Sequence, residues 1–207
     1  SGGALRLIAH DVGAVELTTL HRFTNPKEAQ ATLQLRIGDS AGLDFYTDHD
    51  RLRGGSTSAM TEAAYTGWLA DMQAGLTTFM PAATNAEVVA LSARARLDRV
   101  TAGQVEPHGV ELHDGNHAGT GDWIVTRRNN RRLFLHHGRD WVRNGDPWHV
   151  LQRHPDGSLL VRHLSHGGRI LLPAAYVRDD VELLYASTIH RGQGGTVDTA
   201  HPSSPRA

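Results

Sequence analysis

The chain has 207 residues, no cysteine and a formal net charge of −1. This length allows one large core or one core with a small second domain, and the lack of cysteine excludes disulfide bonds and thiolate metal sites. No apolar run approaches the roughly 20 residues that span a bilayer, and the start shows no signal peptide, so the sequence predicts a cytoplasmic protein without a membrane span.

The charge is unevenly distributed along the chain. Residues 1–120 carry a net charge of −5, residues 121–178 carry +6, and residues 179–207 carry −2. Ten arginines lie in the middle segment, and Lys27 is the only lysine. Arginine recognises phosphate with a planar, bidentate geometry, so the basic segment is a candidate surface for a polyanion. A general preference for arginine codons also explains the enrichment, but it does not explain the clustering.

The first hundred residues predict alternating strands and helices. The expected elements are a strand at 14–18, a helix at 26–38, a polar loop at 48–55, a helix at 56–75, a strand at 76–82 and a helix at 84–103. Asn25 before Pro26, and Thr84 or Asn85 before Glu87, are typical of helix starts. This order favours an α/β fold with a parallel sheet.

The pattern changes to short strands and turns from about residue 120. The expected strands are 122–128, 148–154, 158–164 and 168–177, followed by an apolar strand at 181–190. The turn at 155–157 ends in Gly157, which supplies positive φ for a hairpin. Short strands this close together predict a small antiparallel barrel or meander. The predicted domains are a first α/β part at 1–118, an inserted basic β module at 119–178, a return to the α/β part at 179–201 and a disordered tail at 202–207.

The stretch "YASTIHRGQGGTVD", residues 185–198, concentrates polar groups and glycines behind a strand. Glycines allow close backbone approach to a ligand, and the N–H groups of a helix start bind phosphate. Thr188, His190 and Gln193 are candidates for hydrogen bonds to a phosphate or a sugar. The stretch matches neither the Walker A pattern nor G-x-G-x-x-G. The alternative is an ordinary turn from strand to helix.

Arginines and tryptophans alternate in the basic segment. The arginines are Arg127, Arg128, Arg131, Arg132 and Arg143, and the tryptophans are Trp123, Trp141 and Trp148. Cations for phosphates and aromatic faces for unpaired bases are typical of a single-strand surface. The alternative is a solvated charged hairpin over a core anchored by the tryptophans. The fourteen histidines show no metal-binding spacing, and no hydrolase motif occurs, so no metal site is expected.

Five ordered motifs carry a resemblance to a known family. They are "L-x-x-L-H-R-F", "P-A-A-T-N-A-E-V-x-x-L-x-x-x-A-R", "G-D-W-I-V-T-R-R-N-x-R", "W-V-R-N-G-D" and the 185–198 stretch. From about residue 3 to 201 the chain resembles the second motor domain of superfamily-one DNA helicases of the RecD type, and in particular the helicase half of the TrwC/TraA conjugative relaxases of actinobacteria. The resemblance implies an incomplete RecA-like parallel-sheet domain with an inserted small antiparallel β-barrel.

The resemblance also implies roles for individual residues. Arg22, directly after the strand predicted at 14–18, would contact the γ-phosphate of ATP as the catalytic residue, and Gly194 would lie near the nucleotide. The residues expected to contact DNA are Thr84, Asn85, Arg127, Arg128, Asn129, Arg143, Asn144, Thr188, His190, Gln193 and Gly194.

The chain departs from the family by lacking G-x-x-x-x-G-K-[ST], the acidic magnesium motif of the first motor domain, and the arginine-bearing motif VI. We therefore expect a fragment truncated at both ends that binds single-stranded DNA, supplies one face of an ATP cleft and does not hydrolyse ATP alone. ATP and magnesium are implied for the intact parent and none for this chain alone. The expected partners are single-stranded DNA and the missing first motor domain. The alternative function is a non-enzymatic protein-interaction module.

Overall fold

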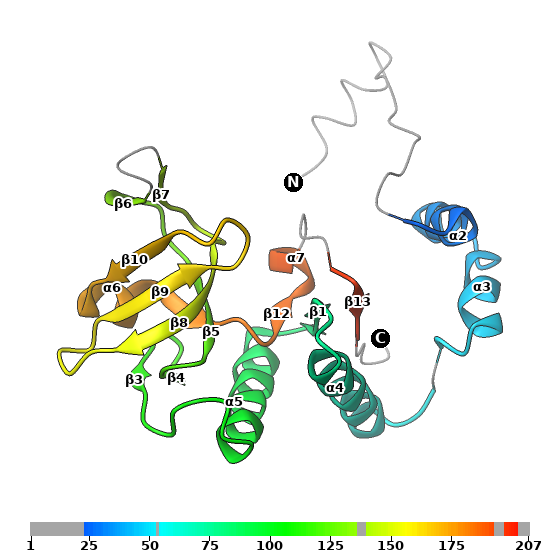
Figure 1. Ribbon diagram of the computed structural model, residues 1–207. Coiled ribbons are helices and arrows are strands. Elements are labelled where there is room, and N and C mark those ends of the chain that lie inside the picture. The colour runs from blue at the N-terminus through cyan, green and yellow to red at the C-terminus, as the bar shows by residue number, and fades with distance from the viewer. Residues whose placement is uncertain (1–22, 53, 136–139, 193–196, 203–207) are drawn as a thin grey trace, which may run out of the picture. The chain divides into compact units, whose positions relative to one another are not determined.

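The computed structural model describes residues 23–52, 54–135, 140–192 and 197–202 (Figure 1). It divides into two compact units, Ser1–Gly54 and Gly55–Ala207, called here the first and the second unit. The strand expected at 14–18 lies outside the described residues, as does the tail beyond Pro202. Among the helices of the described ranges, none is long and apolar enough to cross a membrane.

The first unit contains a pair of short helices, α2 (Pro26–Arg36) and α3 (Gly42–Asp48). The Asn25 side chain accepts a hydrogen bond from the Lys27 amide and caps α2, as the sequence predicted. Sequence reasoning assigned no element to α3. The Thr32 and Tyr46 hydroxyl groups, 3.0 Å apart, join the two helices, and a Cβ on Gly42 would overlap the carbonyl of Ala31, so the close approach depends on glycine.

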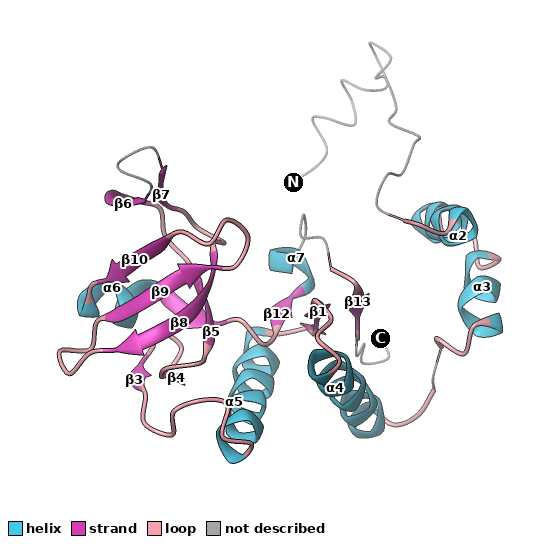
Figure 2. Ribbon diagram, viewed as in Figure 1, coloured by secondary structure: helices cyan, strands magenta, loops and turns pink. Residues whose placement is uncertain are grey.

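The second unit begins with two helices, which are separated along the chain by two short strands (Figure 2). Its first elements are α4 (Thr57–Gln73), β1 (Thr78–Phe79), β2 (Pro81–Ala82) and α5 (Asn85–Thr101). A capping box fixes the start of α5, because Thr84 accepts from the Glu87 amide while the Glu87 carboxylate accepts from the Thr84 amide. The single strand predicted at 76–82 is instead two strands. They are separate because each pairs with a different partner.

Parallel pairing joins these strands to segments more than one hundred residues later in the chain. β1 pairs with β13 (Thr199–Ala200), and β2 pairs with β12 (Ser187–Thr188), both in parallel. The described residues thus contain the predicted parallel pairing as two two-stranded sheets. The fold is mixed α/β, and a continuous RecA-like sheet stays a prediction.

Between β2 and β12 the chain forms an antiparallel region that we call the β module. It holds β3 (Val110–Glu111), β4 (His117–Ala118), β5 (Trp123–Thr126), β6 (Asn130–Leu135), β7 (Asp140–Val142), β8 (Pro147–Arg153), β9 (Leu159–His163), β10 (Arg169–Leu172), α6 (Ala174–Asp180) and β11 (Val181–Leu183). Five of these strands form one sheet in the order β10-β9-β8-β5-β11. Closure of this sheet into a barrel stays a prediction.

The strands expected at 168–177 and at 181–190 are wrong in the structure. The run at 168–177 is strand only as far as Leu172, because Pro173 cannot donate a ladder hydrogen bond and instead precedes α6 as its cap residue. The run at 181–190 divides into β11 and β12 and ends in a short helix, α7 (Ile189–Gly192). The first piece pairs with β5 and the second with β2, so one apolar run serves two sheets.

The core of the second unit is continuous from the helices into the β module. Tyr65 and Trp68 of α4 and Ala95 of α5 are buried in the same cluster as Ile124 and Trp148 of the β module. The α/β part and the β module therefore share apolar burial, which stabilises their mutual position by removing that surface from water.

Candidate functional site

The ends of the parallel strands β2 and β12 lie at one edge of the second unit, which we call the β2–β12 edge. Ala82 is the register partner of Thr188, so Thr84 and Asn85, two and three residues further on, start α5 close to the start of α7. A cavity of about 520 Å³ opens there, lined by Phe79, Ala82, Ala83, Thr188, Ile189, His190 and Gly192. Carboxyl ends of parallel strands are the usual place for ligands in α/β sheets.

The lining of this cavity is mostly apolar, and it carries little positive charge. Glu87 accepts hydrogen bonds from the amides of Ala83 and Thr84 at 2.9 and 3.1 Å, so its carboxylate already occupies N–H groups of the α5 start. The side chains at this edge that can hydrogen-bond to a phosphate are those of Asn85, Thr188 and His190. A Cβ on Gly192 would overlap the Phe79 ring, which explains a glycine at that position.

A second group of predicted residues meets where two turns of the β module lie side by side. The Thr126 hydroxyl donates to the carbonyl of Arg143 at 2.6 Å, and the Asn144 amide donates to the Asn129 side chain at 2.9 Å. We call this surface the arginine edge, and its members are Arg128, Asn129, Arg131, Arg132, Arg143 and Asn144. The structure thus brings together most of the predicted DNA contacts of the basic segment.

The part of the arginine edge that comes from the β5–β6 segment lines a groove of about 640 Å³ next to α6. Arg128 is 73% exposed and lies 3.7 Å from Asp180, and Arg143 is 52% exposed and lies 2.6 Å from Asp140. Exposed ion pairs of this kind contribute about 0–1 kcal/mol and are screened by salt. An incoming phosphate can therefore compete with both carboxylates for these guanidinium groups.

Arg127 is placed differently from its neighbours. Its side chain is 15% exposed and its Nε donates to Glu182 at 2.7 Å. Glu182, which is only 7% exposed, also holds Arg191 of α7 at 3.0 Å and lies 3.5 Å from His113. Through these ion pairs the Glu182 carboxylate connects α7 to the end of β5. The charge of Arg127 is therefore neutralised by a partner inside the protein.

The sequence does not predict a role for Glu182, because its partners lie far away along the chain. The only signal was a single acid within the apolar run "VELLY". An acid in such a position needs a cationic partner when it is buried, but the run itself does not say which one.

The tryptophans of the basic segment do not act together. Trp148 is completely buried, and its indole N–H donates to the Thr126 hydroxyl at 3.2 Å, so the expectation that its face meets a base is wrong. Trp123 is partly buried beside Tyr185. Trp141 keeps its place among surface arginines, with the guanidinium carbons of Arg131 and Arg143 at 5.4 and 4.9 Å from its ring.

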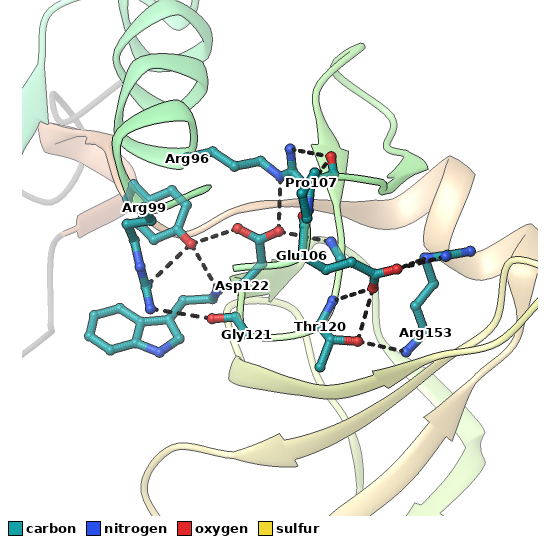
Figure 3. A network of polar contacts seen from close by, with 11 residues as sticks. Arg96, Arg99, Glu106, Pro107, Thr120, Gly121, Asp122 and Arg153 are labelled. Carbon is teal, nitrogen blue, oxygen red and sulfur yellow. Dashed lines mark hydrogen bonds and ion pairs between the residues drawn. The ribbon is translucent and has the colours of Figure 1, made fainter. Parts of the chain in front are cut away.

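A network of polar contacts, which we call the junction, joins α5 to the β module (Figure 3). Asp122 is fully buried and accepts hydrogen bonds from Arg96 at 2.9 Å, from the Gly119 amide at 2.8 Å and from the Tyr185 hydroxyl at 2.6 Å. Burial raises the pKa of the Asp122 carboxyl and the pKa of the Tyr185 hydroxyl above their ordinary values. Because every contact is internal, this carboxylate serves the structure and not a ligand.

The second half of the junction is more open. Glu106 accepts from Arg153 at 2.7 Å and from the Thr120 hydroxyl at 3.0 Å (Figure 3). The hydrogen bond from Arg153 lowers the pKa of Glu106 to about 2. Arg96 also donates to the carbonyl of Glu106 at 2.8 Å, so this arginine connects both carboxylate residues of the junction.

Three predicted site residues, Arg22, Gln193 and Gly194, lie outside the described residues. Two of them, Arg22 and Gly194, were the expected nucleotide contacts, so contact with ATP stays a prediction. Within the described ranges, no group of three or more histidine, aspartate or glutamate side chains could hold a metal ion.

Comparisons with known proteins relate the chain to conjugal transfer. Residues 1–57 match the family described as AAA domain, and this match ends close to the boundary between the two units. The chain is 30% identical over 205 residues to the conjugal transfer protein TraA of Agrobacterium fabrum. The aligned residues cover 96% of this chain and 18% of the relative. It is 27% identical over 203 residues to a probable conjugal transfer protein TraA of Sinorhizobium fredii and 29% identical over 204 residues to TraA of Rhizobium radiobacter, again with 96% and 18% covered.

The chain is thus homologous to conjugal transfer proteins and spans 18% of the length of the curated relatives it matches. These relatives are rhizobial, so the expected closeness to actinobacterial relaxases stays a prediction.

Proposed function

We propose that this homologue of the conjugal transfer proteins is a piece of an ATP-dependent DNA helicase that holds single-stranded DNA on the arginine edge of its second unit. The observation that carries the proposal is the convergence of four exposed arginines. Arg128, Arg131 and Arg132 line one groove, and Arg143 lies over the same Trp141 ring as Arg131. Exposed arginines gathered on one surface bind the phosphates of a nucleic acid through charge-assisted hydrogen bonds and counterion release.

The homology and the motif order support the finer parts of the proposal. In it, the chain is a RecD-like second motor domain in which a module at 119–178 interrupts an α/β part at 1–118 and 179–201. The β2–β12 edge, with Thr84, Asn85, Thr188 and His190, adds neutral contacts to the DNA backbone. In this proposal Arg127 does not contact the DNA directly, because its guanidinium is bonded to Glu182 inside the protein.

ATP and magnesium belong to the intact parent in this proposal, since the phosphate-binding motif does not occur in the sequence. The chain alone is then unable to hydrolyse ATP, and the first motor domain is its partner at the nucleotide. Hydrolysis by the chain alone, measured as phosphate release with and without single-stranded DNA, would contradict this part.

The DNA-binding part is tested with a labelled 20-nucleotide single strand and fluorescence anisotropy over a range of salt concentrations. We expect the double variant Arg128→Ala/Arg131→Ala to bind about tenfold more weakly at moderate salt, because two phosphate contacts are lost. The slope of log affinity against log salt should fall by roughly 1.4, at about 0.7 for each contact to a single strand.

A matched control removes two exposed arginines from the first unit, Arg36→Ala/Arg51→Ala. It changes the net charge by the same amount and should keep nearly all of the affinity. Equal losses in both variants would mean that net charge alone attracts DNA. Two results would favour the non-enzymatic interaction module instead. One is an affinity for DNA that does not depend on salt, and the other is saturable binding of a partner protein that added DNA does not change.

A further inference from the structure

The two strands of the β6–β7 hairpin present one buried and one outward face. Leu135 and Val142 are buried, at 2% and 0% exposure. Their chain neighbours Phe134 and Trp141 are register partners in the antiparallel pair. The side chains of Phe134 and Trp141 therefore share one face of the hairpin, the face opposite to Leu135 and Val142. Directly opposed residues have Cβ atoms about 5 Å apart, so the two side chains leave the strands at neighbouring points of the same face.

This aromatic pair is unusually open for such large apolar side chains. Phe134 is 61% exposed, although phenylalanine is among the residues most often found inside proteins. Trp141 is partly exposed, whereas Trp68 and Trp148 are 1% and 0% exposed in the core. The exposed aromatic face therefore does not result from a general lack of burial in this unit.

Arginines surround the pair. The guanidinium groups of Arg131 and Arg143 lie over the Trp141 ring, at 5.4 and 4.9 Å from its centre, and Arg132 is exposed on the same strand as Phe134. A ligand that fits must offer a flat face to the rings and negative charge to the guanidinium groups. An unpaired nucleotide offers both, because its base has a π-face and its phosphate is anionic.

We infer that Phe134 and Trp141 form a stacking platform for unpaired bases of single-stranded nucleic acid, with Arg131, Arg132 and Arg143 taking the neighbouring phosphates. The inference rests on the proposed function and adds to it a second mode of contact, through bases and not only through the backbone. When a base stacks on Trp141, a guanidinium group leaves the ring and becomes available to a phosphate. Contacts of this kind accept any base, because every base has a π-face.

The test compares two ligands of equal charge and length, a 12-nucleotide oligothymidylate and a 12-unit abasic deoxyribose phosphate strand. The full chain should bind oligothymidylate more tightly than the abasic strand. Phe134→Ala should weaken oligothymidylate binding about tenfold, the usual size for one lost stacking contact, and should change binding of the abasic strand less than twofold. Trp141→Phe keeps a π-face and should retain most of the affinity, whereas Trp141→Ala should behave as Phe134→Ala.

Leu97→Ala serves as the matched control, because Leu97 is 63% exposed on α5 and has no aromatic ring. Circular dichroism and the melting temperature should be unchanged in Phe134→Ala and Leu97→Ala, whose side chains are 61% and 63% exposed. If oligothymidylate binds to the wild type and Phe134→Ala leaves its affinity unchanged, or weakens both ligands equally, the platform is wrong and the proposed function stands. If neither ligand binds to the wild type, both are wrong.

Discussion

The junction and the arginine edge use the same residue types for opposite purposes. At the junction, Arg96 lies against a carboxylate, Asp122, that is fully buried and meets three donors. At the arginine edge, Arg128 lies 3.7 Å from Asp180 and is 73% exposed. A buried and saturated ion pair holds elements together, whereas an exposed and incomplete one leaves the cation free to exchange its partner. Burial, and not residue type, therefore separates the structural arginines of this chain from those available to a ligand.

The largest expected effect is at the buried end of this comparison. Asp122→Asn removes the charge that Arg96 faces and replaces an acceptor oxygen with a donor among three other donors. Breaking a buried pair in this way costs about 3–5 kcal/mol, which urea unfolding would show as a lower midpoint. Asp44→Asn, on the exposed surface of α3, is the control and should cost less than about 0.5 kcal/mol. If Asp122→Asn lowers the free energy of unfolding by less than about 1 kcal/mol, the contrast between the junction and the arginine edge is wrong. The buried ion pair would then contribute no more than a surface pair.

A smaller effect is expected from Glu106 and depends on pH. Its pKa is lowered to about 2 by Arg153, from an ordinary value near 4.5. A lowered pKa in the folded state means that the contact stabilises the protein fully above about pH 5.5, and that this stability is lost as pH falls from about 5 toward 2. Because Glu106 is 28% exposed, we expect a loss of about 1–2 kcal/mol after allowance for solvent screening.

The check is the unfolding free energy of the wild type and of Glu106→Gln from pH 6 to pH 3. Above pH 5.5 the variant should be less stable, and the two curves should converge as the pH falls. Parallel curves would show that other carboxyl groups account for the acid sensitivity.

The smallest effect lies at the arginine edge itself. Asp179 lines the groove and is 56% exposed. Asp179→Asn should raise the affinity for single-stranded DNA two- to threefold at low salt, because a negative charge beside the phosphates is removed, and should change stability by less than about 0.5 kcal/mol. Anisotropy at two salt concentrations measures it, with Asp44→Asn as the control. An unchanged affinity would place the DNA away from this groove.

Local signals in the sequence predicted α2, α4 and α5 but not the shorter helices α3 and α6. Asn25 and Thr84 cap α2 and α5 as expected, because capping depends on residues three or fewer positions apart. Strand boundaries were less predictable. The apolar run at 168–177 contains Pro173, but periodicity alone does not show whether a proline ends a strand or starts a helix. Which of β12 and β13 pairs with which earlier strand depends on contacts across more than one hundred residues.

The candidate site was predictable in composition but not in detail. The clustering of arginines indicated a basic surface, and the structure gathers Arg128, Arg131, Arg132 and Arg143 on it. Sequence reasoning had no means of separating Arg127 from Arg128, because only the fold brings Glu182 to the first and leaves the second exposed. The sequence analysis likewise treated Trp141 and Trp148 as equivalent, although the first is partly exposed and the second is buried.

The central claim is that single-stranded DNA lies on the arginine edge, and photocrosslinking tests it most directly. A 20-nucleotide strand containing 4-thiothymidine is bound to the full chain, irradiated and mapped by mass spectrometry of the crosslinked peptides. We expect crosslinks in peptides that carry residues 127–135 and 141–144, and fewer of them in Arg128→Ala/Arg131→Ala. Crosslinks confined to the first unit or to the α4 surface, with none in these peptides, would contradict the claim.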